Sequence, residues 1–162
     1  MADSSEKSVD QARLDAGQAI LELTDSFGFD ALAAGWLHDK PTDAWRYFLV
    51  TPMLKSNGPE WIYSRLLRIF RKFPLPAGIS PLDIYVIDEA MEMSAFGKPL
   101  LAFDHNRSVP GVRMTIKQAV KLPGFMITDG SVIFIRRTPE EVRKRLGNPA
   151  RRFDKTIQKL AA

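Results

Sequence analysis

The stretch WRYFLVTPMLKSNGPEWIYSRLLRIFRKF, residues 45–73, decides the fold, because the most apolar strand candidate stands directly before the most amphipathic helix candidate. Its first seven residues alternate between two faces, and both faces are mostly apolar, which is typical of a strand covered on both sides. Pro52 ends this strand. Turn-forming residues at 56–58 lead to Pro59, which suits a first helical position because its missing N–H costs nothing there. The sequence therefore predicts a strand and then a helix over 59–73.

The predicted helix over residues 59–73 has an apolar arc and a basic arc on a helical wheel. We expect the apolar arc to dock on the sheet. It contains Ile62, Tyr63, Leu66, Leu67, Ile69, Phe70 and Phe73. The opposite arc contains the cations, which are Arg65, Arg68, Arg71 and Lys72.

Trp61 falls among the cations of the basic arc and not in the apolar arc. One interpretation is that this first-turn tryptophan folds back onto the preceding loop while the cations are only solvated. The other is that it stays partly exposed and anchors a patch for phosphates, an acidic partner or a membrane surface. On the second interpretation, Trp61 marks the main partner surface.

The composition fits a globular chain, since the 162 residues are 45% hydrophobic and 10% aromatic. We expect a disordered tail over residues 1–8 and a single α+β domain over residues 9–162. No apolar run approaches about 20 residues, which predicts no membrane span, and the first residues lack the order of a secretory signal. A cytoplasmic location follows by default.

The sequence has no cysteine and only two histidines, His38 and His105. This composition excludes disulfides, thiolate metal sites, zinc fingers and cysteine nucleophiles, and it argues against histidine-rich metal sites. We therefore expect neither a metal site nor a cofactor.

The net charge of +4 is unevenly distributed along the chain. Residues 1–45 carry three Lys/Arg against nine Asp/Glu, residues 46–135 eleven against seven, and residues 136–162 nine against three. The chain thus runs from acidic to basic. Such polarity suits a basic end that binds nucleic acid, and it equally suits terminal helices that pack together or self-associate head to tail.

A first helix is predicted from residue 9 to Gly28, where the glycine supplies a stop. Its apolar stripe contains Val9, Ala12, Ala16, Ala19, Ile20, Leu23 and Phe27. Residues 31–38 and 45–51 flank a loop rich in turn formers, which predicts a β-hairpin. Residues 73–81 contain repeated prolines and are predicted to be an ordered loop.

Beyond this loop the sequence predicts mainly strands. Strands are expected at 82–88, 99–103, 112–117, 125–128 and 131–137, with a helical turn or loop at 89–96 and an exposed loop at 104–111. Asp129-Gly130 predicts a type I′ turn that pairs the last two strands as a hairpin.

The C-terminal region is predicted to form two short helices that meet at a bend over residues 147–149. Thr138, Pro139 and Glu141 give the pattern of a capped helix start. One apolar stripe crosses the bend and contains Val142, Leu146, Phe153, Ile157 and Leu160. The cations expected to point outward are Arg151, Arg152, Lys155 and Lys159.

The predicted order of elements is α-β-β-α-β, further strands and a final α. An antiparallel sheet accommodates this order without long crossovers. We therefore predict an α+β fold of one domain, with a mostly antiparallel β-sheet of about five to seven strands and helices packed mainly on one face.

Asp88, Asp104 and His105 are the candidate catalytic residues. The run at 84–89 has the apolar-then-acidic form of a Walker B strand, but no phosphate-binding loop accompanies it, so a strand that ends in solvated acids is the simpler interpretation. Carboxylates with one histidine could bind Mg²⁺ or Mn²⁺, or His105 could act as a general base, if the fold brought them together. Motifs of serine hydrolases, Rossmann dehydrogenases and zincins are absent.

Three basic clusters contribute to a possible nucleic-acid interface: the basic arc at 61–72, the arginines and lysine of 136–145, and the cations of 151–159. If they converge, up to about ten phosphate contacts are possible, with a steep dependence on salt. The acidic first third of the chain opposes this function.

The sequence favours a non-catalytic cytosolic binding or regulatory module that acts through contacts with a protein partner or a second copy. Nucleic-acid binding is the alternative, and a metal-dependent hydrolase is the third hypothesis. The candidate binding residues are Trp61, Arg65, Arg68, Lys72, Arg151, Arg152 and Lys155.

Overall fold

The centre of the fold is an antiparallel pair of strands, β1 (Ala33–Asp39) and β2 (Ala44–Val50). We describe it from a computed structural model, which covers residues 10–39, 42–88, 112–115, 120–122, 125–127, 132–135 and 149–161. In this pair Ala33 lies opposite Val50, and Asp39 lies opposite Ala44. The predicted hairpin of residues 31–38 and 45–51 is thereby confirmed.

Strand β2 is buried on both faces over its C-terminal half, as the sequence predicts. Tyr47 and Leu49 belong to the cluster that packs against the helices, and Phe48 and Val50 on the opposite face are equally buried. The second neighbour of β2 is β3 (Ile84–Ile87), which runs parallel to it. A parallel neighbour requires a long crossover, which the helices and the loop between β2 and β3 supply.

Strand β3 is shorter than the strand predicted at 82–88, because residues Pro81–Asp83 form the 3₁₀ turn η1. The Ser80 hydroxyl accepts a hydrogen bond from the Leu82 N–H, and the Asp83 carboxylate accepts one from the Ser80 N–H. This reciprocal cap fixes the turn in front of the strand.

Four short strands lie beyond β1: β4 (Val112–Thr115), β5 (Val120–Leu122), β6 (Phe125–Ile127) and β7 (Val132–Ile135). Both β6 and β7 pair with β1, while β5 pairs with β6 and β4 with β7. The predicted pairing of residues 125–128 with 131–137 is therefore wrong, because both strands lie along the same edge of β1. The Asp129-Gly130 turn itself lies outside the described residues.

Mixed α+β character is confirmed, whereas the predicted strand number and element order stay predictions. Several predicted segments lie outside the described residues. They are the tail 1–8, the segments 89–96, 99–103 and 104–111, and the helix start at Thr138. Within the described part of the chain, no helix has the length and apolar character that a membrane crossing requires.

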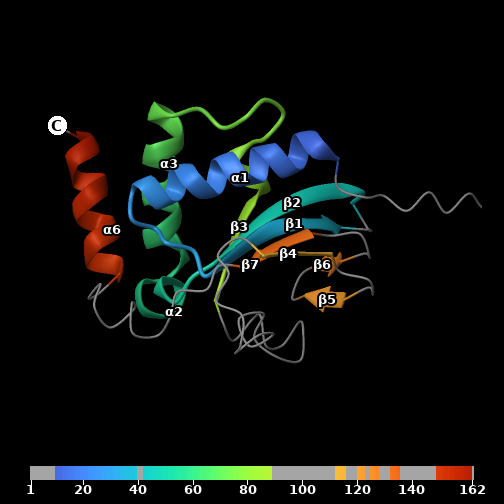
Figure 1. The fold of residues 1–162 in the computed structure, drawn as a ribbon. Helices are drawn as coiled ribbons and strands as arrows, with labels where there is room; N and C mark the ends of the chain where they lie inside the picture. The colour runs from blue at the N-terminus through green and yellow to red at the C-terminus, as the bar shows by residue number, and fades with distance from the viewer. Residues whose placement is uncertain are drawn as a thin grey trace, which may run out of the picture.

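Helix α1 (Gln11–Ser26) lies across one face of the β1–β2 pair, as Figure 1 shows. Two aromatic side chains of the sheet fasten it, since the Trp36 indole N–H donates to the Arg13 carbonyl at 2.7 Å and the Tyr47 hydroxyl to the Gly17 carbonyl at 2.8 Å. The helix ends before Gly28, which has a φ of +82°.

The apolar stripe predicted for the first helix is only partly correct. Its described members Ala12 and Ala19 are exposed, whereas Ile20 is fully buried. The other buried positions of α1 are Gly17, Leu21 and Thr24. The face of α1 that packs on the sheet is therefore rotated away from the alanine stripe.

Helix α3 (Pro59–Lys72) confirms the helix predicted over 59–73 and packs on the same face of the sheet as α1. Its buried side chains are Ile62, Leu66, Ile69 and Phe70. Leu67 and Phe73 were predicted in the docking arc but remain 39% and 41% exposed, because the sheet covers only part of that arc. A short helix that the sequence did not predict, α2 (Met53–Asn57), precedes α3.

Helix α6 (Pro149–Gln158), continued by the 3₁₀ turn η3 (Lys159–Ala161), lies beside α3 (Figure 1). Phe153 and Ile157 are fully buried, as the C-terminal apolar stripe predicts. Phe153 meets the ring of Phe29 edge-on, with centroids 5.3 Å apart. Helix α6 thus closes the core on the side of α3 that does not touch the sheet.

Candidate binding surface on helix α3

The Trp61–Arg65 pair of α3 faces α6. The Trp61 ring meets the Phe153 ring edge-on with centroids 6.0 Å apart, and the Arg65 guanidinium carbon lies 3.8 Å from the Trp61 ring centroid. Arg65 also donates through Nε and Nη2 to Asp154 Oδ1 at 2.8 and 2.6 Å. Trp61 is partly buried, and its cover comes from α6, whereas the sequence suggested either the preceding loop or a partner.

Arg152, which was expected to point outward, forms an ion pair with Asp30 and is only partly exposed. Among the other candidate binding residues, Arg68, Lys72, Arg151 and Lys155 are exposed. The structure therefore divides the candidate set. Trp61, Arg65 and Arg152 connect elements of the fold, and Arg68, Lys72 and Lys155 remain accessible to another molecule.

Arg68, Arg71 and Lys72 of α3 and Leu160 of η3 line a concave surface of about 440 Å³, which we call the basic groove. Helices α3 and α6 run in the same direction. Trp61, near the start of α3, lies against Phe153 in the middle of α6, and Leu160, just beyond α6, lies near the end of α3. The C-termini of both helices thus lie at one end of the molecule, as Figure 1 shows.

The surroundings of the basic groove are strongly cationic. Helix α3 and residues 149–161 together carry eight Lys/Arg and only two carboxylates, Glu60 and Asp154. Arg65 and Arg152 are engaged in ion pairs within the chain. Of these eight cations, the ones without a carboxylate partner in the described part of the chain are Arg68, Arg71, Lys72, Lys155 and Lys159.

Cations near a helix C-terminus are favourable in themselves, because they complement the helix dipole. A concave arrangement of several such cations does more, since one carboxylate or phosphate can reach two of them at once. Arg71 belongs to this arrangement although it was not among the candidate binding residues. The sequence feature that could have identified Arg71 is its place on the basic arc of the helix.

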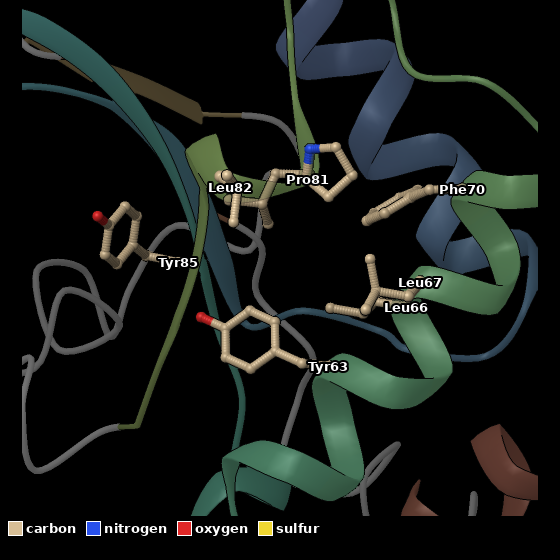
Figure 2. A pocket seen from close by; sticks show the side chains of 8 residues that line it. Tyr63, Leu66, Leu67, Phe70, Pro81, Leu82 and Tyr85 are labelled. Atoms are coloured by element: carbon tan, nitrogen blue, oxygen red, sulfur yellow. The ribbon is translucent and has the colours of Figure 1, made fainter.

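A second concave surface lies between α3 and β3, and we call it the apolar groove. It has a volume of about 350 Å³ and is shown in Figure 2. Its lining residues are Tyr63, Leu66, Leu67, Phe70, Pro81, Leu82, Ile84 and Tyr85. Leu82 is 83% exposed, which is unusual for a leucine beside an apolar cavity.

Tyr63 connects α3 to β3 at the edge of the apolar groove. Its hydroxyl oxygen accepts a hydrogen bond from the Val86 N–H at 2.9 Å. Burial raises the pKa of Tyr63, while the hydrogen bond from Val86 acts in the opposite direction. On the other wall, Arg46 donates to Asp83 at 2.8 Å and so ties η1 to β2. Both walls of the groove are thereby fixed by polar contacts.

Of the candidate catalytic residues, only Asp88 lies within the described part of the chain, so their convergence stays a prediction. Asp88 follows β3 and is partly buried, whereas Asp104 and His105 lie outside the described residues. Asp83, the residue before β3, is paired with Arg46. The described residues contain no group of three or more His, Asp or Glu side chains that could hold a metal ion.

His38 is buried, and its Nε2 lies 2.9 Å from Asp43 Oδ1. Its ring also packs on Trp45, with centroids 5.0 Å apart. This histidine therefore joins the two strands of the β1–β2 hairpin beside its turn, which is a structural role.

The basic groove and the apolar groove are therefore two concave surfaces of the described part of the fold, and both use α3. Comparison of the chain with protein-family models, with curated proteins and with solved structures finds no match.

Proposed function

We propose that this protein is a non-catalytic binding module of the cytosol that holds an acidic segment of a partner protein in the basic groove. The observation that carries the proposal is that Arg68, Arg71 and Lys72 line one concave surface without a carboxylate partner among the described residues. Guanidinium groups bind carboxylates through paired hydrogen bonds, so Asp and Glu side chains complement this groove. The module itself is proposed to be one α+β domain with a sheet of about five to seven strands.

A protein segment fits the groove better than a nucleic-acid backbone. Leu160 supplies an apolar wall, and the apolar groove lies on the other flank of α3. A peptide can present carboxylates and aliphatic side chains together, whereas a nucleic-acid backbone presents mainly phosphates. The nine Asp/Glu in residues 1–45 also lower the positive field that a nucleic acid would meet.

Nucleic-acid binding remains the second candidate, favoured by one observation. Lys155 and Lys159 are exposed and continue the cationic surface along the C-terminal segment. Such an extended surface would give a binding constant that falls steeply with salt. The third hypothesis, a metal-dependent hydrolase, has no supporting cluster within the described residues.

The experiment measures fluorescence anisotropy of two labelled probes, a poly-glutamate peptide of about 20 residues and a DNA duplex of similar charge, at two salt concentrations. We compare Arg68→Glu with Lys55→Glu. Both substitutions change the net charge equally, but Lys55 is an exposed residue of α2, at the opposite end of α3 (Figure 1). We expect the peptide to bind saturably, with a Kd weakened about tenfold by Arg68→Glu and less than about twofold by Lys55→Glu.

Equal losses in the two variants would show that only net charge acts, and the groove proposal would fail. It would also fail if the peptide showed no saturable binding up to about 1 mM. Saturable binding of the duplex alone, with a steep salt dependence, would establish the nucleic-acid function in its place.

A further inference from the structure

We propose that the apolar groove receives a large apolar side chain of the same partner, so that the partner segment is an acidic amphipathic helix of another protein. This inference rests on the proposed function and specifies its partner. It adds an anchor position to the charge contacts of the basic groove.

The shape and exposure of the apolar groove indicate an anchor site. Figure 2 shows Pro81 and Leu82 on one side of it and Leu66, Leu67 and Phe70 on the other. Its volume of about 350 Å³ lies near the lower end of ligand sites, which suits one or two side chains and not an extended cofactor. Covering Leu82 and Leu67, which are 83% and 39% exposed, would remove apolar surface from water.

The two grooves lie on either side of the exposed flank of α3 that carries Leu67 and Arg71. Leu67 lines the apolar groove, and Arg71, four residues later, lines the basic groove. Side chains four residues apart on a helix are neighbours, about 6 Å apart. A partner helix that carries a large apolar residue and a carboxylate three or four positions away has the same spacing. Its apolar residue can therefore enter one groove while its carboxylate reaches Arg71.

The helices of a second copy do not supply such an occupant in the described part of the chain. The acidic helix α1 exposes Asp15 and Glu22, but the apolar residues on its exposed side are Ala12 and Ala19. Alanine side chains are too short to fill the groove. The described large apolar side chains that are exposed are Leu67, Phe73 and Leu82, and two of these already line the groove. No described helix of a second copy therefore offers this pattern, and the proposal places the occupant on another protein.

The experiment compares two helical peptides of equal negative charge. The first contains Glu and Ala only, and the second replaces two Ala residues, four positions apart, by Leu. Their Kd values are measured on the wild-type chain, on Leu82→Ser and on Phe73→Ser. Phe73 is a matched control because it is an exposed apolar residue outside the groove.

We expect the leucine peptide to bind wild type about tenfold more tightly than the alanine peptide. Leu82→Ser should abolish this difference without weakening the alanine peptide, and Phe73→Ser should preserve it. Circular dichroism establishes that each variant is folded.

The outcomes separate the inference from the function on which it rests. If both peptides bind equally while Arg68→Glu still weakens them, the anchor inference is wrong and the proposed function stands. If neither peptide binds, the proposed function itself fails. If the chain alone dimerises in sedimentation and Leu82→Ser abolishes the dimer, the occupant is a second copy, and the inference is overturned.

Discussion

Helix α3 packs against the sheet with one flank and against α6 with another, and the two contacts are made of different side chains. The sheet contact is apolar and dry, with Ile62 and Ile69 fully buried. The contact with α6 combines the Trp61–Phe153 ring pair with the Arg65–Asp154 ion pair, whose side chains are 21% and 30% exposed. An ion pair at this exposure stabilises much less than buried apolar surface. We therefore expect the sheet contact to dominate the stability and the contact with α6 to contribute less.

The largest effect should follow from Leu66→Ala, on the sheet flank of α3. Leu66 is 1% exposed, so its truncation should lower the free energy of unfolding by about 2–5 kcal/mol, through lost burial and a new cavity. The matched variant Leu67→Ala changes the neighbouring residue, which is 39% exposed, and should cost less than about 1 kcal/mol. Urea unfolding measures both. Similar losses in the two variants would mean that Leu67 is packed as tightly as Leu66, which would contradict the assignment of the flanks.

A smaller effect is expected from Trp61→Ala, on the α6 flank. This substitution removes the ring contact with Phe153 and the cation–π contact with Arg65, so unfolding free energy should fall by about 2 kcal/mol. Trp61→Phe should recover part of this loss, because it retains an aromatic ring. If Trp61 is instead a partner anchor, Trp61→Ala should weaken binding of the acidic peptide and leave the free energy of unfolding unchanged. That result would contradict the structural role that we assign to Trp61.

The difference between the flanks also explains what the sequence could predict. The spacing of Ile62, Leu66 and Ile69 is a local pattern, and it correctly gave the docking flank of α3. The contact of Arg65 with Asp154 joins residues 89 positions apart, and no local pattern encodes it. Cations on a helix surface look solvated until the partner element is placed.

The apolar groove was missed for a similar reason. Leu82 was assigned to a strand, in which its side chain would alternate with its neighbours and need not line a cavity with α3. The Ser80–Asp83 cap that turns residues Pro81–Asp83 into η1 is readable in the sequence as a capping pattern. The position of Leu82 opposite Leu67 and Phe70 cannot be predicted from the sequence, because it depends on the parallel placement of β3 beside β2.

The smallest expected effect tests the third flank of α3, where Tyr63 meets the edge of β3. Tyr63→Phe removes the acceptor of the Val86 N–H and should cost about 1 kcal/mol of stability near neutral pH.

The effect of Tyr63→Phe should also depend on pH. Burial raises the pKa of Tyr63 in the folded chain, so the unfolded chain releases this proton first, above a pH of about 10. The folded state then binds more protons than the unfolded state, and stability falls as pH rises through this region. Because Tyr63→Phe lacks this loss, the stability difference between wild type and variant should narrow from pH 8 to a pH of about 11. Urea unfolding at the two pH values measures the difference. A constant difference would show that the Tyr63 hydroxyl is as accessible to water in the folded chain as in the unfolded one, and that this flank of α3 is open.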